Sequence, residues 1–194
     1  MLDAGPTRTV IPTVIPTVDR SAPMRVYVPT TLHALAQAHA DGGLGPLPLR
    51  AYAVTPALRE WYLSDDIEEL EYAALVRAAQ SSLRLLALDG AAPRRRVVVA
   101  LDVPDRSVAL QVDAEHADAA ALGAVTLSEA PPLARAAAVH ADADDPDVRD
   151  SVAAAAVAVA AADAGDEDAR FTVDGAEDHE LLWFATQEIP GLLA

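Results

Sequence analysis

The sequence predicts a single α/β domain in which helices pack on a mixed, mostly parallel sheet. Two consecutive segments, residues 24–39 and 49–62, repeat the order strand, threonine, helix, which is the pattern of a β-α-β unit. The later run 97–101 is apolar at every position, as an interior strand of a covered sheet requires. The chain of 194 residues is 52% hydrophobic, which is ample for one packed core. An α+β sandwich of the ferredoxin-like kind, with an antiparallel sheet, is the alternative.

The first unit begins with the β-branched and aromatic run 25–28, which predicts a buried strand that Pro29 ends. Thr30 and Thr31 then offer hydroxyl groups to the free N–H groups of a helix over 32–39. The pair Gly42-Gly43 ends that helix.

The second unit has a strand over 49–54, Thr55 as the N-cap, and Pro56 in the first turn of a short helix that ends near Tyr62. A longer helix opens at 64–66 and runs to Asp89. Its apolar stripe predicts that it packs across the sheet, while its opposite side carries Glu69, Arg77, Gln80 and Arg84.

The rest of the chain adds a third strand over 95–103 and a weakly patterned middle over 107–123. We expect an edge strand at 124–127, a strand at 136–141, and an alanine-rich helix from Pro146 to about Asp163. An acidic turn follows at 165–168. The last element, 180–189, is predicted as a strand, with a C-terminal helix as the alternative.

Residues 1–23 are rich in proline and threonine, so neither a helix nor a central strand is expected there. We interpret them as a disordered tail or a mis-assigned start, and residues 24–194 as the domain. A docking peptide in polyproline conformation is the alternative for this tail.

Composition excludes several classes of function. The formal net charge is −16 and all 14 basic residues are arginine, so binding to nucleic acid is not expected. The chain has no cysteine and therefore no thiolate zinc site or cysteine nucleophile. No apolar run approaches the roughly twenty residues of a membrane span, so we expect a cytoplasmic protein without membrane contact.

Four segments resemble a small actinobacterial family of unknown function. They are Met-Arg-Val-Tyr-Val-Pro-Thr-Thr-Leu at 24–32, Arg-Ala-Tyr-Ala-Val-Thr-Pro-Ala-Leu-Arg-Glu-Trp at 50–61, Glu-Leu-Glu-Tyr-Ala-Ala-Leu at 69–75 and His-Glu-Leu-Leu-Trp-Phe-Ala-Thr-Gln-Glu-Ile-Pro at 179–190. The resemblance implies an actinobacterial source and a chain that starts near Met24. It implies no activity, cofactor or catalytic residue.

A ligand site is predicted beyond the carboxyl ends of the parallel strands, where helix N-termini and loop residues converge. Helix N-termini and arginine side chains favour an anion such as a phosphate or carboxylate. In the alternative, the threonine residues only cap their helices. The candidate ligand-binding residues are Thr30, Thr31, Thr55, Arg59, Asp102, Asp105 and Arg106.

His140, Asp142 and Asp144 alternate along the chain, so an extended backbone would direct all three side chains to one face. This set suits a divalent metal such as Mg²⁺, Mn²⁺ or Zn²⁺. The alternative is a solvated acidic entry to the following helix.

Two charged clusters have less specific interpretations. Carboxylates follow Trp61 and Tyr62, and among them Glu68 and Glu71 are spaced as a helical pair. The alternative for that cluster is favourable electrostatics at a helix start. The run 94–96 is Arg-Arg-Arg, which we interpret as a phosphate site, a solvated edge, or an internal partner for carboxylates.

Three functional hypotheses remain open. The leading one is a non-enzymatic module that binds a small anionic ligand or a protein partner. The second is a metal-dependent hydrolase or phosphotransfer enzyme, which requires His140, Asp142 and Asp102 to converge on a cavity. The third is a self-associating structural protein that pairs through an edge strand.

Overall fold

The computed structural model describes residues 23–110 and 121–194. These residues form one seven-stranded sheet in the order β4-β5-β2-β1-β3-β6-β7, and every neighbouring pair is antiparallel. The strands are β1 (Pro23–Thr30), β2 (Leu49–Ala53), β3 (Val97–Pro104), β4 (Val108–Leu110), β5 (Ala124–Leu127), β6 (Ala136–Ala141) and β7 (Leu182–Phe184). The helices are α1 (Leu32–Asp41), α2 (Pro56–Tyr62), α3 (Ile67–Leu88), α4 (Pro146–Asp163), α5 (Glu167–Gly175) and α6 (Ile189–Leu192).

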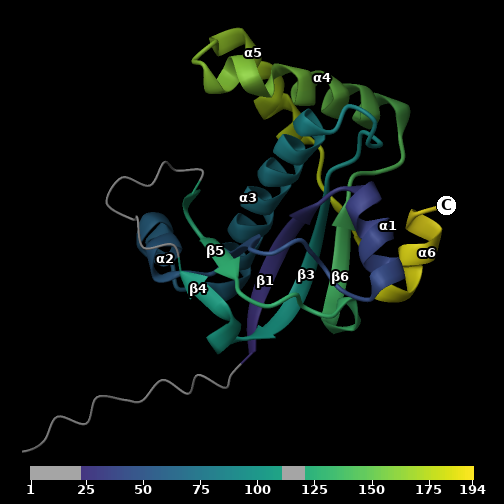
Figure 1. The fold of residues 1–194 in the computed structure, drawn as a ribbon. Helices are drawn as coiled ribbons and strands as arrows, with labels where there is room; N and C mark the ends of the chain where they lie inside the picture. The colour runs from purple at the N-terminus through teal and green to yellow at the C-terminus, as the bar shows by residue number, and fades with distance from the viewer. Residues whose placement is uncertain (1–22, 111–120) are drawn as a thin grey trace, which may run out of the picture.

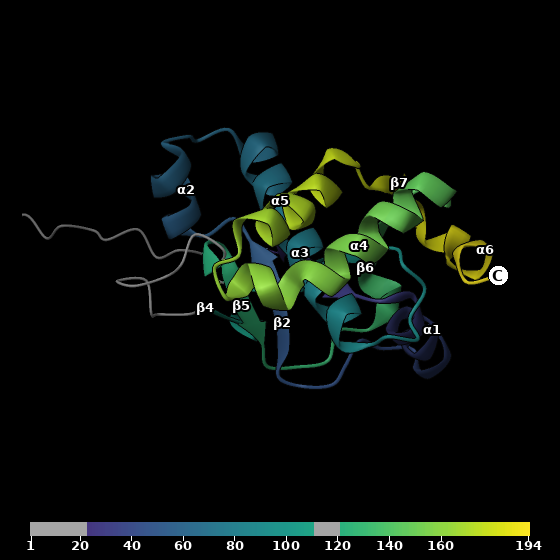
Figure 2. The ribbon, with the colours of Figure 1, turned by 90° about the horizontal axis from the view of Figure 1, so that it is seen from above.

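The sheet separates two apolar cores. On one face α1 and Ile189 of α6 cover Val26, Val99 and neighbouring side chains. On the other face α3 covers Val98, Ala100 and the residues around them. A third, smaller core lies where α4 packs on the C-terminal half of α3. Figure 1 shows α4 and α5 lying across that end of α3, and Figure 2 shows them side by side from above.

The prediction of a mostly parallel sheet is wrong, and the molecule has the α+β class of the alternative. The apolar run in β3 misled the prediction, because helices on both faces of an antiparallel sheet also require apolar residues at successive positions. The alternation of strand and helix does not encode strand direction. The segment after α1 pairs at Gly43 with Pro132, and Leu49 then pairs with Leu127, so the chain enters β2 antiparallel to β1.

Most of the individual elements agree with the sequence. The helices expected at 32–39, 56–62, from 64–66 to Asp89, and at 146–163 are confirmed, as are the strands at 49–54, 95–103 and 136–141. The strand expected at 25–28 is also present, but Pro29 does not end it: β1 continues to Thr30, and Pro29 lies opposite Val98. The strand at 124–127 is also present, but it lies between β2 and β4 and not at the edge.

The structure differs from the sequence predictions in two C-terminal segments. Helix α5 forms where an acidic turn is expected, because the Asp166 side chain accepts a hydrogen bond from the Ala169 N–H and caps the helix. The last segment contains both the short strand β7 and the short helix α6. The predicted tail lies outside the described residues, apart from Pro23, which begins β1. Most of the weakly patterned middle segment also lies outside the described residues.

Candidate functional site

The two helix starts that would form the predicted anion site lie at different ends of the β1–β2 pair. Thr31 caps α1 by accepting a hydrogen bond from the Ala34 N–H at 3.2 Å, and Thr55 caps α2 in the same way. Thr31 follows the C-terminal end of β1. Thr55 follows Ala53, which lies opposite Val26 in the N-terminal half of β1. The antiparallel sheet therefore separates the two helix starts, and the threonine hydroxyl groups act as caps.

The charged members of the predicted ligand set also have separate surroundings. The Asp102 carboxylate accepts two hydrogen bonds from Arg25, at 2.7 and 3.1 Å. The Arg59 guanidinium lies 3.7 Å from the carboxylate of Asp65. Asp105 and Arg106 lie in the short turn after β3, and Arg106 lines a cavity of about 280 Å³ that none of the other six residues lines. Thr30 is buried beside Val97, so the seven residues do not line one site.

The three predicted metal ligands are directed to different partners. The buried Asp142 carboxylate accepts hydrogen bonds from the Arg96 guanidinium and from the Arg96 backbone N–H, the latter at 2.6 Å. The exposed Asp144 lies 3.5 Å from Arg149. Among residues 23–110 and 121–194, no group of three histidine or carboxylate side chains is arranged to hold a metal ion.

His140, the third of these residues, belongs to the face of the sheet that α3 covers. Its ring centroid lies 6.5 Å from that of Tyr27, in an edge-on arrangement. Burial lowers the pKa of His140, and the positive charge of Arg25 lowers it further. His140 and Asp142 therefore have environments that do not combine into one site.

The arginine run 94–96 serves inside the protein. Arg96 pairs with Asp142, and the Arg95 guanidinium donates two hydrogen bonds to the Asp142 backbone carbonyl, at 2.9 and 2.7 Å. Arg94 donates to backbone carbonyls at the end of α3, including that of Leu86 at 2.6 Å. The interpretation of this run as an internal partner for carboxylates is confirmed for Arg96.

The predicted carboxylate pair in α3 is divided between two roles. Glu71 accepts a hydrogen bond of 3.3 Å from the Tyr27 hydroxyl, and burial together with the Glu71 charge raises the pKa of Tyr27 to about 12. Glu68 lies in the exposed first turn, where the Asp66 side chain caps the helix. The helix-start interpretation of this acidic cluster is thus confirmed at Asp66.

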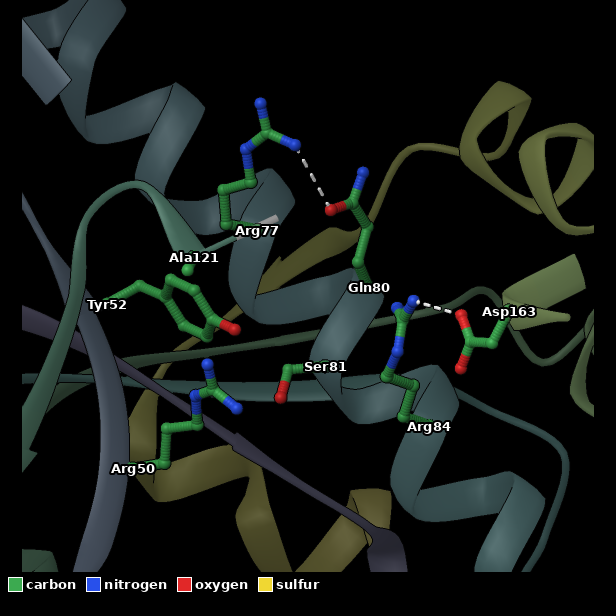
Figure 3. Close-up of a pocket in the computed structure, with 8 residues that line it drawn as sticks. All are labelled: Arg50, Tyr52, Arg77, Gln80, Ser81, Arg84, Ala121 and Asp163. Carbon is green, nitrogen blue, oxygen red and sulfur yellow. Dashed lines mark hydrogen bonds and ion pairs between the residues drawn. The ribbon is translucent and has the colours of Figure 1, made fainter. Parts of the chain in front are cut away.

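The structure contains a pocket of about 390 Å³ that is lined by three arginine side chains. The sequence did not predict a site at this place. Figure 3 shows how these side chains surround it, with contributions from β2, α3, the end of α4 and the residue that precedes Leu122. The lining residues are Arg50, Tyr52, Arg77, Gln80, Ser81, Arg84, Ala121 and Asp163.

Helix α3 supplies half of the lining because its polar residues recur with helical spacing. Arg77, Gln80, Ser81 and Arg84 stand three, four and seven positions apart, which aligns them on one side of the helix. Ala74, Ala78 and other small residues on the opposite side pack against the sheet. The apolar packing of α3 therefore directs this polar stripe toward the pocket.

Strand β2 supplies the facing side. Side chains alternate along a strand, and Ala51 and Ala53 point into the core beneath α1. Tyr52 consequently points toward α3, and Arg50 lies on the same face, with its guanidinium carbon 5.8 Å from the centre of the Tyr52 ring. Thr126 of β5 is the strand neighbour of Arg50.

The pocket combines three guanidinium groups with one carboxylate. Arg84 donates a hydrogen bond of 2.9 Å to Asp163, which connects α3 to the end of α4. Arg77 donates to Gln80 at 3.4 Å, and Gln80 donates in turn to Glu177 at 2.7 Å. Within the described part of the chain, no carboxylate lies in ion-pair distance of Arg50 or Arg77. Both guanidinium groups can therefore donate to an anion.

A second cavity, of about 450 Å³, adjoins this pocket and shares Arg77, Gln80, Arg84 and Asp163 with it. Helix α5 contributes Arg170 and Asp174 to its far side, and Glu177 follows. The lining of this second cavity has as many carboxylates as arginines, so its charges balance. The first pocket has three arginines and one carboxylate, and it therefore favours an anion more strongly.

One sequence signal could have indicated the pocket. The stripe 77, 80, 81, 84 carries two arginines and no carboxylate, although the chain has 30 acidic residues against 14 basic ones. Residue spacing alone assigns this stripe to the solvated side of α3. Predicting that Arg50 joins this stripe requires knowing which face of β2 meets α3. The topology of the folded sheet decides which face that is.

Comparison with known protein families matches residues 24–193 to a family of unknown function, DUF6912. The chain belongs to this family. The match covers the described strands from Met24 onward and the six described α-helices, including the elements that line the arginine pocket, so the DUF6912 domain and the fold described above coincide. No curated protein and no solved structure matches the chain. No described helix of this DUF6912 domain combines the length and the apolar character needed to cross a bilayer.

Proposed function

We propose that this DUF6912 protein is a non-enzymatic module that binds a small anion in the pocket formed by Arg50, Arg77 and Arg84. The observation that carries the proposal is the absence of a carboxylate in ion-pair distance of Arg50 and Arg77 within residues 23–110 and 121–194. In a chain with a net charge of −16, arginines that line one cavity are best explained by an anionic ligand.

The chemistry of the lining favours a phosphate or carboxylate ligand. Each guanidinium presents N–H groups in a planar fork that matches two oxygen atoms of such an anion. The Ser81 hydroxyl and the side-chain amide of Gln80 lie on the same stripe and offer further donors. A volume of about 390 Å³ suits a small metabolite.

The same lining supports binding and gives no support to catalysis. Asp163 is the carboxylate of the lining, and Arg84 holds it at 2.9 Å. Ser81 has no histidine among the lining residues to activate it. The residues expected for a metal-dependent enzyme, His140, Asp142 and Asp102, have separate partners in the fold, so no observation favours that alternative.

Thermal unfolding with a panel of anions tests the proposal. The panel consists of orthophosphate, pyrophosphate, a nucleoside monophosphate, succinate and citrate. A ligand at about one hundred times its Kd stabilises the folded chain by roughly 2.7 kcal/mol, which corresponds to a rise in Tm of roughly 5–10 °C for a domain of this size. We expect at least one anion to give this rise in the unmodified chain.

Variants connect the rise in Tm to the pocket. Arg77→Gln and Arg50→Gln each remove one guanidinium and should abolish most of the shift. Arg149→Gln removes an exposed arginine outside the pocket and is the matched control, which should retain the shift. Equal shifts in all three variants would show that the anion binds elsewhere, and the pocket proposal would then fail.

A further inference from the structure

The corner between α2 and α3 exposes apolar side chains that the core does not use. Leu63 is 90% exposed, Trp61 is 61% exposed and Ile67 is 47% exposed. The three residues lie between the last turn of α2 and the first residue of α3, and we call them the apolar corner. Figure 1 and Figure 2 show α2 beside the start of α3, on the side of the molecule away from α1. A concentration of exposed apolar residues of this kind is typical of an interaction surface.

The backbone of this corner holds Leu63 in a conformation that leucine disfavours. The Leu63 N–H donates to the Glu60 carbonyl and the Ser64 N–H donates to the Arg59 carbonyl, which closes the end of α2. This arrangement gives Leu63 a φ of 50°, and among the described residues it is the one non-glycine residue with positive φ. Glycine is the residue that this position favours for folding. A leucine that is strained and almost fully exposed is therefore not explained by stability.

Exposed carboxylates neighbour the apolar corner along the chain, and their charge favours a basic partner. Residues 59–69 include five acidic side chains, Glu60, Asp65, Asp66, Glu68 and Glu69, and one basic side chain, Arg59. All five carboxylates belong to exposed residues, and Asp65 lies 3.7 Å from the half-exposed Arg59. The surface therefore combines apolar contact area with a negative rim.

We propose that this corner docks a basic amphipathic segment of another protein. Leucine-like side chains of that segment contact Trp61, Leu63 and Ile67, and its lysine or arginine side chains pair with the rim. The negative rim and the net charge of −16 oppose both a second copy of this chain and an anionic membrane surface. This docking surface is separate from the arginine pocket and does not depend on the proposed anion.

Fluorescence of Trp61 provides a direct measurement. The chain has two tryptophans, so Trp183→Phe leaves Trp61 as the single reporter. This variant is titrated with an amphipathic helical peptide of leucine and lysine, and with a matched peptide in which glutamate replaces lysine. We expect a saturable blue shift of Trp61 emission with the lysine peptide, weakened by added salt, and no shift with the glutamate peptide.

The decisive variant is Leu63→Gly in the same background. Glycine suits the backbone at φ 50°, so this variant should fold with an equal or higher Tm, and its affinity for the lysine peptide should fall about tenfold or more. Leu88→Gly removes a comparably exposed leucine at the other end of α3 and should leave the affinity unchanged. Its expected loss of Tm separates effects on stability from effects on docking.

Three results would overturn the proposal. Equal affinity of the Leu63→Gly variant for the lysine peptide would show that charge alone causes the binding. Absence of saturable binding by the lysine peptide would show that the corner does not dock basic amphipathic segments. A dimer in sedimentation that Leu63→Gly dissociates would assign the corner to a second copy of the chain.

Discussion

Arg96 and Asp142 form an ion pair that is almost completely enclosed in the protein. The Arg96 Nη2 atom lies 2.6 Å from Asp142 Oδ1, and the two side chains are 4% and 0% exposed. Arg96 also donates to the His179 carbonyl, and Arg95 donates to the Asp142 carbonyl. The pair therefore connects the start of β3 with the segments that follow β6 and precede β7.

Replacement of Asp142 should destabilise the protein strongly. Asp142→Asn leaves the buried Arg96 charge without a counter-charge, and the free energy of unfolding should fall by about 3–5 kcal/mol. Denaturant unfolding monitored by circular dichroism measures the loss. Asp144→Asn removes the exposed carboxylate near Arg149 and should change the free energy by less than about 0.5 kcal/mol. Equal effects of the two variants would contradict a structural role specific to Asp142.

Two adjacent serines in α3 should differ in their contribution to stability. The buried Ser82 hydroxyl donates to the Thr30 carbonyl at 2.7 Å and accepts from the Val97 N–H at 2.9 Å. Ser82→Ala leaves both backbone groups unsatisfied and should cost about 2 kcal/mol. Ser81→Ala, in the arginine pocket, should cost less than about 0.5 kcal/mol. Calorimetric unfolding of both variants checks this, and a Ser81→Ala loss as large as that of Ser82→Ala would be inconsistent with the structure.

His140 should make stability depend on pH below neutrality. Burial against the sheet lowers the pKa of the folded His140 imidazole below its ordinary value of 6.5, so the unfolded chain binds a proton more readily than the folded one. The stabilising contribution of neutral His140 is thus complete above pH 6.5 and is lost as the pH falls from 6.5 toward the pKa of the folded state.

Unfolding free energies between pH 5 and 7.5 measure this dependence. The His140→Gln variant should show a shallower decrease than the unmodified chain, because its side chain does not titrate. His39→Gln changes an exposed histidine on α1 and should retain the original slope. If His140→Gln also retained it, burial of the imidazole would not be the cause.

Local elements could be predicted from the sequence because local chemistry decides them. Thr31 and Thr55 act as expected caps, and the apolar stripe of α3 packs on the sheet as predicted. Strand direction depends on long-range pairing, such as that of Gly43 with Pro132 and of Leu49 with Leu127. No local pattern in the sequence indicates these pairs, and for this reason the prediction of a mostly parallel sheet is wrong.

The candidate site, like the fold, depends on long-range pairing that the local sequence does not show. The ligand residues predicted from a parallel sheet are separated by the antiparallel one, and Asp142 accepts hydrogen bonds from Arg96. Two of the pocket arginines, Arg77 and Arg84, are visible in the sequence as part of a polar stripe on α3. Their relation to Arg50 of β2 appears only in the folded protein, because it depends on which face of the sheet α3 covers.

The measurement that tests the central claim most directly is a calorimetric titration of pyrophosphate into the unmodified 194-residue chain and into its Arg77→Gln variant. We expect one saturable site per chain in the unmodified protein, weakened by added salt, and an affinity at least about tenfold lower in the variant, since a charge-assisted hydrogen bond contributes roughly 1.5–3 kcal/mol. Unchanged affinity in Arg77→Gln, or no binding by the unmodified chain at millimolar pyrophosphate, would contradict the claim that Arg50, Arg77 and Arg84 form an anion site.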